Sequence, residues 1–294
     1  MDALWVLFTL IAAGAQTARN AMQRELIGAL GAVGASQVRF LFGLPFAALF
    51  LILVEWALHA PTPSLTFTTF AWIALGALAQ VAATALMLAA MRRRSFVVVV
   101  AFTKTEAAQV ALFSLLFLGE RPTPALMVSI ALATIGVFLV SARGVAQAGS
   151  ARAAIEGLVS AAFFAIAAIA FRQAIIKTDA QSFVLAATFT LAVGLLVQTG
   201  ALMVWLVAFD RSGLAAIVKA WRGSLVAGFM GAFASQFWFL GFAVAEPSRV
   251  RTLALIEVLF AQGVGVAFFG ERPTPREAAG MALILVGTIL LING

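Results

Sequence analysis

The chain has 294 residues, of which 63% are hydrophobic and 11% are charged, whereas about 25% of the residues of ordinary soluble domains are charged. Because so few charged side chains cannot cover a water-exposed surface, the composition excludes a soluble globule and a disordered chain, and it indicates an all-α membrane protein with several spans. The net charge of +7 comes mostly from basic residues in short gaps between apolar runs, a placement typical of anchoring to lipid headgroups and not of nucleic-acid binding.

Apolar runs long enough to cross a bilayer as helices of about 20 residues follow one another along the chain. In order, the ten predicted spans are 3–23, 34–57, 68–91, 95–118, 124–141, 153–172, 181–208, 221–243, 248–269 and 275–293. The first run follows Asp2 without a preceding basic stretch, so we expect it to be retained as a helix and not cleaved as a signal peptide. Without the divisions at residues 92–94 and 246–249 the count falls to eight, but each undivided run would then exceed 45 residues, far more than one crossing needs.

One six-residue motif, Gly-Glu-Arg-Pro-Thr-Pro, occurs at residues 119–124 and again 151 residues later, at 270–275. The same offset joins Glu106 to Glu257. Locally, the motif predicts one helix that ends at its Gly and a second that begins at its last Pro. We therefore expect the motif itself to be structural, while its repetition shows that the chain contains two related halves.

The number of spans in each half decides how the halves are related. Each half holds five predicted spans, an odd number, so the second copy must enter the membrane in the opposite direction. The sequence therefore predicts two inverted five-helix repeats, residues 1–145 and 152–294, in one integrated domain of ten transmembrane helices around a central cavity. This architecture is typical of transporters, whose substrate sites lie at the repeat interface near the midplane.

The surroundings of the two acids resemble a known family of membrane proteins. Glu106 and Glu257 each lead through an apolar run to one copy of Gly-Glu-Arg, and Arg39 lies near the start of the second span. This pattern resembles the EamA-type ten-helix members of the drug/metabolite transporter superfamily, although Ala107 and Val258 stand where that family usually has Pro. The resemblance implies a basket of ten helices, with the fifth and tenth peripheral, and export of small metabolites similar to that of YddG-type amino-acid carriers.

Among the ionisable residues within the predicted spans, four are singled out as candidates for the interior: Arg39, Lys104, Glu106 and Glu257. Each costs about 2.5–3.5 kcal/mol at the centre of a membrane helix, so we expect them to face the bundle interior or a wet cavity. Lys104 and Glu106 point to nearly opposite faces of a helix, so one narrow cavity cannot take both without help from another helix. We expect Lys104 to bind a substrate carboxylate, with a structural ion pair as the alternative. For Glu106 and Glu257 we expect structural roles, with proton coupling as the alternative, and for Arg39 simple snorkelling.

Polar and aromatic side chains in spans one, three, four and eight complete the predicted lining of the cavity. The predicted substrate contacts are Gln16, Gln80, Thr84, Lys104, Gln236 and Trp238. Each uncharged polar residue could instead bond to a neighbouring helix, a contact worth about 0.6–2 kcal/mol in membranes, and Trp238 could simply pack in the core. Together they indicate one polar cavity.

The sequence offers no recognisable site for chemical catalysis. It has no cysteine and a single histidine, His59, so a metal site built from His and Cys ligands is excluded. The phosphate-binding loop of nucleotide hydrolases, the HExxH motif and the GxSxG elbow do not occur. We therefore expect no enzymatic activity, no cofactor and no metal.

These features together predict a secondary transporter that exports small metabolites, with neutral or aromatic amino acids as the expected class, across the inner (plasma) membrane by alternating access. A channel-like facilitator and an uptake carrier for another metabolite or drug are the alternatives. We expect a monomer in the lipid bilayer, with a small-molecule substrate and no nucleic-acid partner. The driving force and the orientation stay open. The resemblance implies cytoplasmic termini, but of the basic residues assigned to loops twelve, Arg19 among them, lie on the side opposite the termini and five, Arg251 among them, on the side of the termini, and this imbalance favours the reverse orientation.

Overall fold

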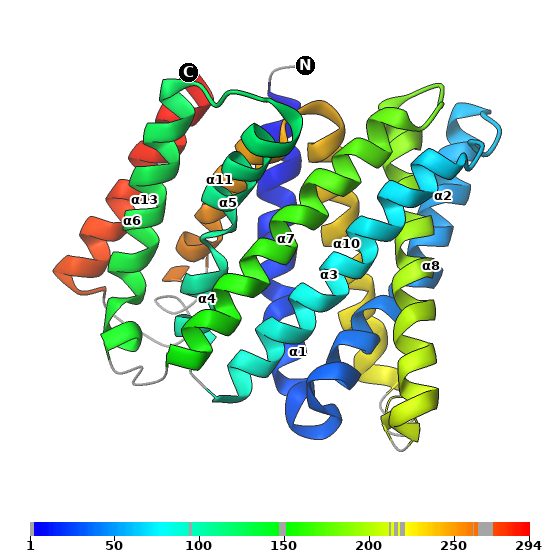
Figure 1. Cartoon of the computed structure of the whole chain (residues 1–294), viewed down its shortest axis with the longest axis horizontal. Coiled ribbons are helices and arrows are strands. Elements are labelled where there is room, and N and C mark those ends of the chain that lie inside the picture. The colour runs from blue at the N-terminus through cyan, green and yellow to red at the C-terminus, as the bar shows by residue number, and fades with distance from the viewer. Residues whose placement is uncertain are drawn as a thin grey trace.

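The computed structural model describes residues 3–93, 96–146, 151–211, 213–214, 217, 221–260, 262–263 and 273–294, and over these residues the chain is helical and contains no strand. The helices, most of them labelled in Figure 1, are α1 (Leu4–Leu41), α2 (Leu44–Leu58), α3 (Phe67–Arg93), α4 (Phe96–Thr103), α5 (Glu106–Phe113), the π-helical segment η1 (Ser114–Leu118), α6 (Pro124–Ala146), α7 (Ala151–Lys177), α8 (Phe183–Phe209), α10 (Trp221–Val244), α11 (Pro247–Leu253), the 3-10 turn η2 (Ala254–Ile256) and α13 (Pro275–Asn293).

Eight helical segments among the described residues are long and apolar enough to cross a membrane. They are Ser36–Leu58, Phe67–Met91, Ala101–Leu118, Pro124–Ser141, Ala154–Lys177, Phe183–Phe209, Trp221–Val244 and Pro275–Asn293. The predicted span 3–23 lies within α1 but is not one of the eight, and the predicted span 248–269 runs into residues 264–272, outside the described part of the chain. The all-helical membrane fold is thus confirmed, whereas the count of ten crossings stays a prediction.

The first helix differs from its predicted form. We expected a break between residues 23 and 34, but α1 continues to Leu41, and the chain turns at Phe42 and Gly43 before α2 begins. Pro45 lies in the first turn of α2, where a missing backbone N–H costs nothing. The tight turn, and not the polar stretch before it, therefore separates the two helices.

The repeated motif forms helix boundaries in the way that its residues predict. Gly119 ends η1 in the left-handed conformation at φ 70°, which a residue without Cβ adopts readily, and Pro124 begins α6. In the second copy Pro275 begins α13, and Thr274 and Glu277 form a reciprocal capping box. Residues 270–272 of that copy lie outside the described residues.

The contact between α6 and α13 shows how the two halves are oriented. A Cβ on Gly136 would lie 2.5 Å from the carbonyl oxygen of Gly280, and a Cβ on Gly287 would lie 3.0 Å from that of Ser129. Adding the offset of 151 to Gly136 and Ser129 gives Gly287 and Gly280, so exchanging the copies exchanges these two contacts. Residue numbers rise along one helix as they fall along the other, so α6 and α13 are antiparallel and related by a local two-fold axis perpendicular to them.

The remaining helices follow the same relation. The helix α3 packs against α7, and α1 packs against α10. When the helices of the two halves are matched in chain order, α1 corresponds to α7 and α3 corresponds to α10. Figure 1 shows α3 and α7 side by side, and it shows both termini at the same end of the molecule. An even number of crossings requires that position of the termini.

Candidate functional site

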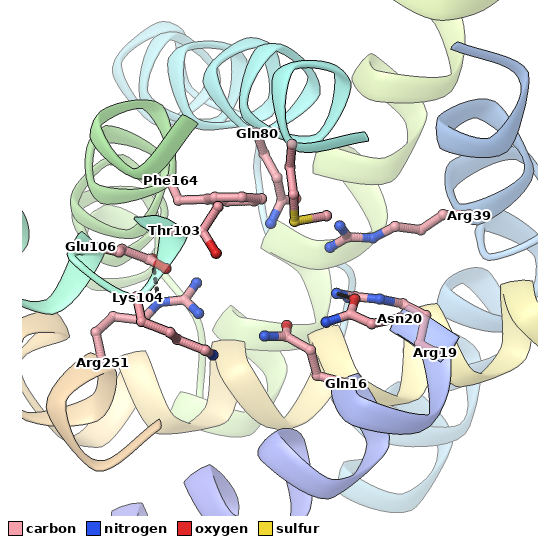
Figure 2. A pocket seen from close by; sticks show the side chains of 11 residues that line it. Gln16, Arg19, Asn20, Arg39, Gln80, Thr103, Lys104, Glu106, Phe164 and Arg251 are labelled. Carbon is pink, nitrogen blue, oxygen red and sulfur yellow. Dashed lines mark hydrogen bonds and ion pairs between the residues drawn. The ribbon is translucent and has the colours of Figure 1, made fainter. Parts of the chain in front are cut away.

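A polar cavity lies between helices of the two halves (Figure 2). Its lining comes from α1, α3, the end of α4 with the turn after it, α5, α7 and α11, and consists of Gln16, Arg19, Asn20, Arg39, Gln80, Met87, Thr103, Lys104, Glu106, Phe164 and Arg251. About 40 Å³ of the cavity is accessible to the centre of a water molecule, and one water needs roughly 10–15 Å³ by the same measure. The cavity therefore has room for a few waters and must widen before it admits a metabolite.

Two ion pairs join the halves of the chain at this cavity. Glu106 Oε1 lies 2.9 Å from Arg251 Nε, and Lys104 Nζ donates a hydrogen bond of 2.5 Å to Glu257 Oε2. Each pair takes one residue from the first repeat and one from the second. The acids occupy equivalent positions at the offset of 151, whereas the positions equivalent to the two bases are apolar, so the repeat conserves the negative charges and not their partners.

Irregular backbone precedes both acids. The helix α4 ends at Thr103, the chain turns at Lys104 and Thr105, and α5 begins at Glu106. In the second half the 3-10 turn η2 ends just before Glu257. Because the turn interrupts the helical spacing, Lys104 and Glu106 both line the cavity and reach separate partners, which a continuous helix would not permit.

A network of contacts connects the two ion pairs. The guanidinium of Arg251 lies 4.6 Å from the centroid of the Trp238 ring, a cation–π distance. Trp238 Nε1 donates a hydrogen bond of 2.9 Å to Gln16 Oε1, and Gln16 Nε2 donates one of 2.8 Å to Glu257 Oε1. Gln16 therefore links Glu257, the partner of Lys104, to the ring beneath Arg251, so two side chains, Gln16 and Trp238, connect the two ion pairs.

Two arginines of the cavity have no acidic partner among the described residues. Arg19 and Arg39 are each 3% exposed. Arg19 Nη2 donates to Asn20 Oδ1 at 2.8 Å, and Arg39 Nη1 donates to Thr84 Oγ1 at 3.4 Å. Arg19 Nε and Nη1 and Arg39 Nε make no hydrogen bond within the described part of the chain. Figure 2 shows both guanidinium groups on the side of the cavity opposite Lys104 and Glu106.

The structure brings together half of the predicted substrate contacts. Gln16, Gln80 and Lys104 line the cavity, and Thr84 lies behind it as the acceptor from Arg39. Gln80 also accepts a hydrogen bond of 2.7 Å from Gln198 of α8. The cavity is thus tied to α8, a helix that does not line it.

The other two predicted contacts lie outside the lining. Gln236 Nε2 donates to Thr188 Oγ1 at 2.7 Å, and both side chains are buried between α10 and α8. Trp238 is buried beneath Arg251. Substrate contact for these two residues stays a prediction.

The assignment of Arg19 and Arg251 to loops is wrong. They are 3% and 7% exposed and belong to the cavity. Both lie inside predicted spans, and that position was the signal available in the sequence. Thr103, which the sequence places on the same face as Lys104, also lines the cavity. Asn20, Met87 and Phe164 line it too, and nothing in their sequence context distinguishes them from helix-packing residues. No group of three or more His, Cys, Asp or Glu side chains that could hold a metal ion occurs in the described ranges.

Comparison with known proteins extends these observations. The model of the EamA-like transporter family matches residues 3–142 and 151–293. The pseudopaline exporter CntI of Pseudomonas aeruginosa strain PAO1 is 28% identical over 182 residues, which are 62% of this chain and 61% of the relative, and the exporter of the same name from strain UCBPP-PA14 matches equally. The match thus spans about three fifths of the length of these relatives. A solved crystal structure superimposes with a TM-score of 0.71 over 98% of this chain and 95% of its own at 14% identity, which shows likeness of fold.

Proposed function

The chain belongs to the EamA-like transporter family of the drug/metabolite transporter superfamily, and from this premise we propose that it exports small metabolites as a secondary carrier that works by alternating access. The proposed transport unit is a monomer of two inverted repeats, residues 1–145 and 152–294, with ten crossings of the inner membrane. The name of its relatives, which are exporters, supports the outward direction.

The observation that carries this proposal is the pair of ion pairs that join opposite repeats across the cavity. Both lie at the repeat interface, where carriers of inverted architecture bind substrate. Because each pair has one residue in each half, a rocking of one half against the other changes both distances at once. The pairs therefore act as contacts that hold this nearly closed state and that must rearrange when the cavity opens.

For the substrate we propose amino acids or related metabolites with a carboxylate, with neutral and aromatic amino acids as the class expected from the sequence. Gln16, Gln80 and Lys104 are the proposed contacts in the closed cavity. For Gln236 and Trp238 we propose contact in a wider state, since neither faces the cavity in this one. Glu106 and Glu257 are proposed as structural acids that position the bases, with exchange of protons as the alternative role.

A flux measurement in proteoliposomes tests this function against its alternatives. Saturable uptake of radiolabelled phenylalanine, with counterflow when unlabelled phenylalanine is preloaded, is the expected result for a carrier. Non-saturable flux at a channel's rate, above about 10⁵ molecules per second, would contradict alternating access. Vesicles that move none of the twenty amino acids would contradict the proposed substrate class, and a growth screen for resistance to amino-acid analogues would then search for another.

Replacing Lys104 by Ala should lower the initial rate of counterflow at least about tenfold, the effect of losing one charge-assisted contact. The change removes a cavity cation and leaves Glu257 Oε2 without its partner. Lys177→Ala is the matched control, because Lys177 is an exposed lysine at the end of α7. Unchanged transport of every carboxylated substrate in Lys104→Ala would contradict a role for Lys104.

The driving force can be separated with two conservative variants. Glu106→Gln and Glu257→Gln keep the shape of each side chain but cannot exchange a proton. If transport is coupled to protons through one of these acids, the pH dependence of counterflow disappears in that variant. If transport is facilitated diffusion, both variants keep the pH dependence of the unchanged protein.

A further inference from the structure

The charges around the cavity do not balance. Four basic side chains line the cavity: Arg19, Arg39, Lys104 and Arg251. Only two acids are available to balance them, Glu106 in the lining and Glu257 beside it. Both acids are already paired, each with one base. Two positive charges are therefore left over among the described residues, and both belong to arginines that are 3% exposed. A buried charge without a partner is costly, so these two arginines indicate a charge that arrives from outside the chain.

The two arginines lie next to each other. A Cβ placed on Gly231 of α10 would be 3.2 Å from Arg39 Cγ and 3.6 Å from Arg19 Cδ. The aliphatic parts of both side chains thus pass over the same glycine, and Figure 2 shows both guanidinium groups entering the cavity from the same side. The absence of a side chain at residue 231 provides the space in which the two arginines lie side by side.

The open hydrogen-bonding capacity at this side of the cavity consists of donors. Arg19 Nε and Nη1 and Arg39 Nε have no acceptor in the described structure. The side-chain oxygens of Gln16, Gln80 and Asn20 each accept a hydrogen bond already, from Trp238, Gln198 and Arg19 respectively. A ligand that completes this site must bring acceptors, and an ammonium group would find few.

We propose that the cavity binds an organic dicarboxylate and that Arg19 and Arg39 each hold one of its carboxylates. A guanidinium fork matches the two oxygens of a carboxylate, and two such groups neutralise the two charges left over in the cavity. This inference rests on the proposed transport function: among the metabolites with a carboxylate proposed above, it favours a dianion over the neutral amino acids expected from the sequence. In this closed state the ion pairs on the opposite wall hold the halves together, so Arg19 and Arg39 are the cations first available to a dianion, and Lys104 stays a further contact on the opposite wall.

The test is a binding measurement on the purified full-length protein in detergent, with succinate as the dicarboxylate probe. Three comparison ligands are measured beside it. Acetate tests whether the second carboxylate matters, phenylalanine tests a neutral amino acid, and inorganic phosphate tests whether any oxyanion binds equally well. We expect succinate to bind at least about tenfold more tightly than any of the three. Succinate affinity no better than that of acetate or phenylalanine, or affinity for phosphate equal to that for succinate, would overturn the proposal.

Arg39→Gln should weaken succinate binding by about tenfold to a hundredfold, which is about 1.4–2.8 kcal/mol. The same variant should have a Tm without ligand equal to or higher than that of the unchanged protein, because it removes a buried charge that has no acidic partner among the described residues and only a long hydrogen bond to Thr84 and a contact with the Phe40 ring. A merely structural arginine would show the opposite, a lower Tm. Arg152→Gln is the control, since the Arg152 side chain is 70% exposed and lies at the N-terminal end of α7, outside the cavity lining.

A second variant moves the arginines without changing their charge. Gly231→Val inserts a branched side chain where a Cβ alone comes within 3.2 Å of Arg39, so it should weaken succinate binding at least about tenfold. Unchanged succinate affinity in both Arg39→Gln and Gly231→Val would overturn the site. Phenylalanine counterflow without succinate binding would overturn the dicarboxylate site and leave the proposed carrier function intact. Succinate binding without flux of any solute would support the dicarboxylate site and overturn the proposed carrier function.

Discussion

Replacing Glu106 by Gln should lower the free energy of unfolding by about 3–5 kcal/mol, the cost of leaving a buried charge without its partner. Glu106 is the acid that faces Arg251 at 2.9 Å, and both side chains are nearly inaccessible to solvent. The substitution leaves Arg251 without a counter-charge in a cavity that already contains two arginines without an acidic partner among the described residues, Arg19 and Arg39. Thermal unfolding in detergent, followed by tryptophan fluorescence, measures the effect as a fall in Tm.

The excess of positive charge makes this effect asymmetric. Glu106→Gln raises the net charge of the cavity, whereas Arg251→Gln lowers it, so the electrostatic cost of losing the acid should exceed that of losing the base. The double variant Glu106→Gln/Arg251→Gln should be more stable than Glu106→Gln alone, because it buries no new unpaired charge. A double variant less stable than the single acid variant would contradict this account. Arg152→Gln breaks an exposed pair with Glu156 and should change stability by less than about 1 kcal/mol.

Replacing Gly136 by Leu should separate α6 from α13 and destabilise the protein by at least about 1–3 kcal/mol, the usual cost of overpacking. Already the first atom of a side chain there would lie 2.5 Å from the carbonyl oxygen of Gly280, so the side chain cannot be accommodated by a change of rotamer. Small residues at such contacts let two membrane helices approach until their backbones touch. Thermal unfolding of the purified variant in detergent measures the loss.

Glycine as such is not the reason for the effect at Gly136. A Cβ on Gly200 of α8 meets no atom within 4 Å, so Gly200→Leu should cost little and Gly200→Ala should stabilise by about 0.4–1 kcal/mol. The local two-fold axis predicts that Gly287→Leu, at the position equivalent to Gly136, is also destabilising, with its Cβ 3.0 Å from a backbone oxygen. Equal stability of Gly136→Leu and Gly200→Leu would show that α6 and α13 do not pack in this way.

The interior of the site followed from the sequence only in part. Glu106 was expected on the opposite face of its helix, whereas Lys104, Gln16 and Gln80 could be predicted to line the cavity because a polar side chain within an apolar run is expensive unless it faces a polar space. Their partners could not, since the residues that meet across the cavity are separated by 145 or more positions in the chain, as in Glu106–Arg251 and Lys104–Glu257. The sequence likewise contains no sign that the helix is interrupted at Lys104, where no Pro stands.

The case of Arg251 shows the same limit. It lies five residues after Glu246, at the start of a predicted span, and was assigned to a loop because Pro and charged residues surround it. In the structure, α11 begins at Pro247 and directs Arg251 over Trp238 and toward Glu106. A base near the end of a span can reach either the membrane surface or a buried acid. The outcome depends on whether another helix places an acid beside it.

The order of residues alone determined that this protein is a bundle of membrane helices and that it is built from two related halves. Those conclusions depend on composition, on the length of apolar runs and on the repeat of 151 residues, all of which are local or periodic properties of a chain. Only the tertiary structure decided which of the cavity's bases have an acidic partner, Lys104 and Arg251, and which have none among the described residues, Arg19 and Arg39. The reason is physical: the energy of a charge in a membrane protein is set by the partner within a few ångströms, and that partner comes from a distant part of the chain.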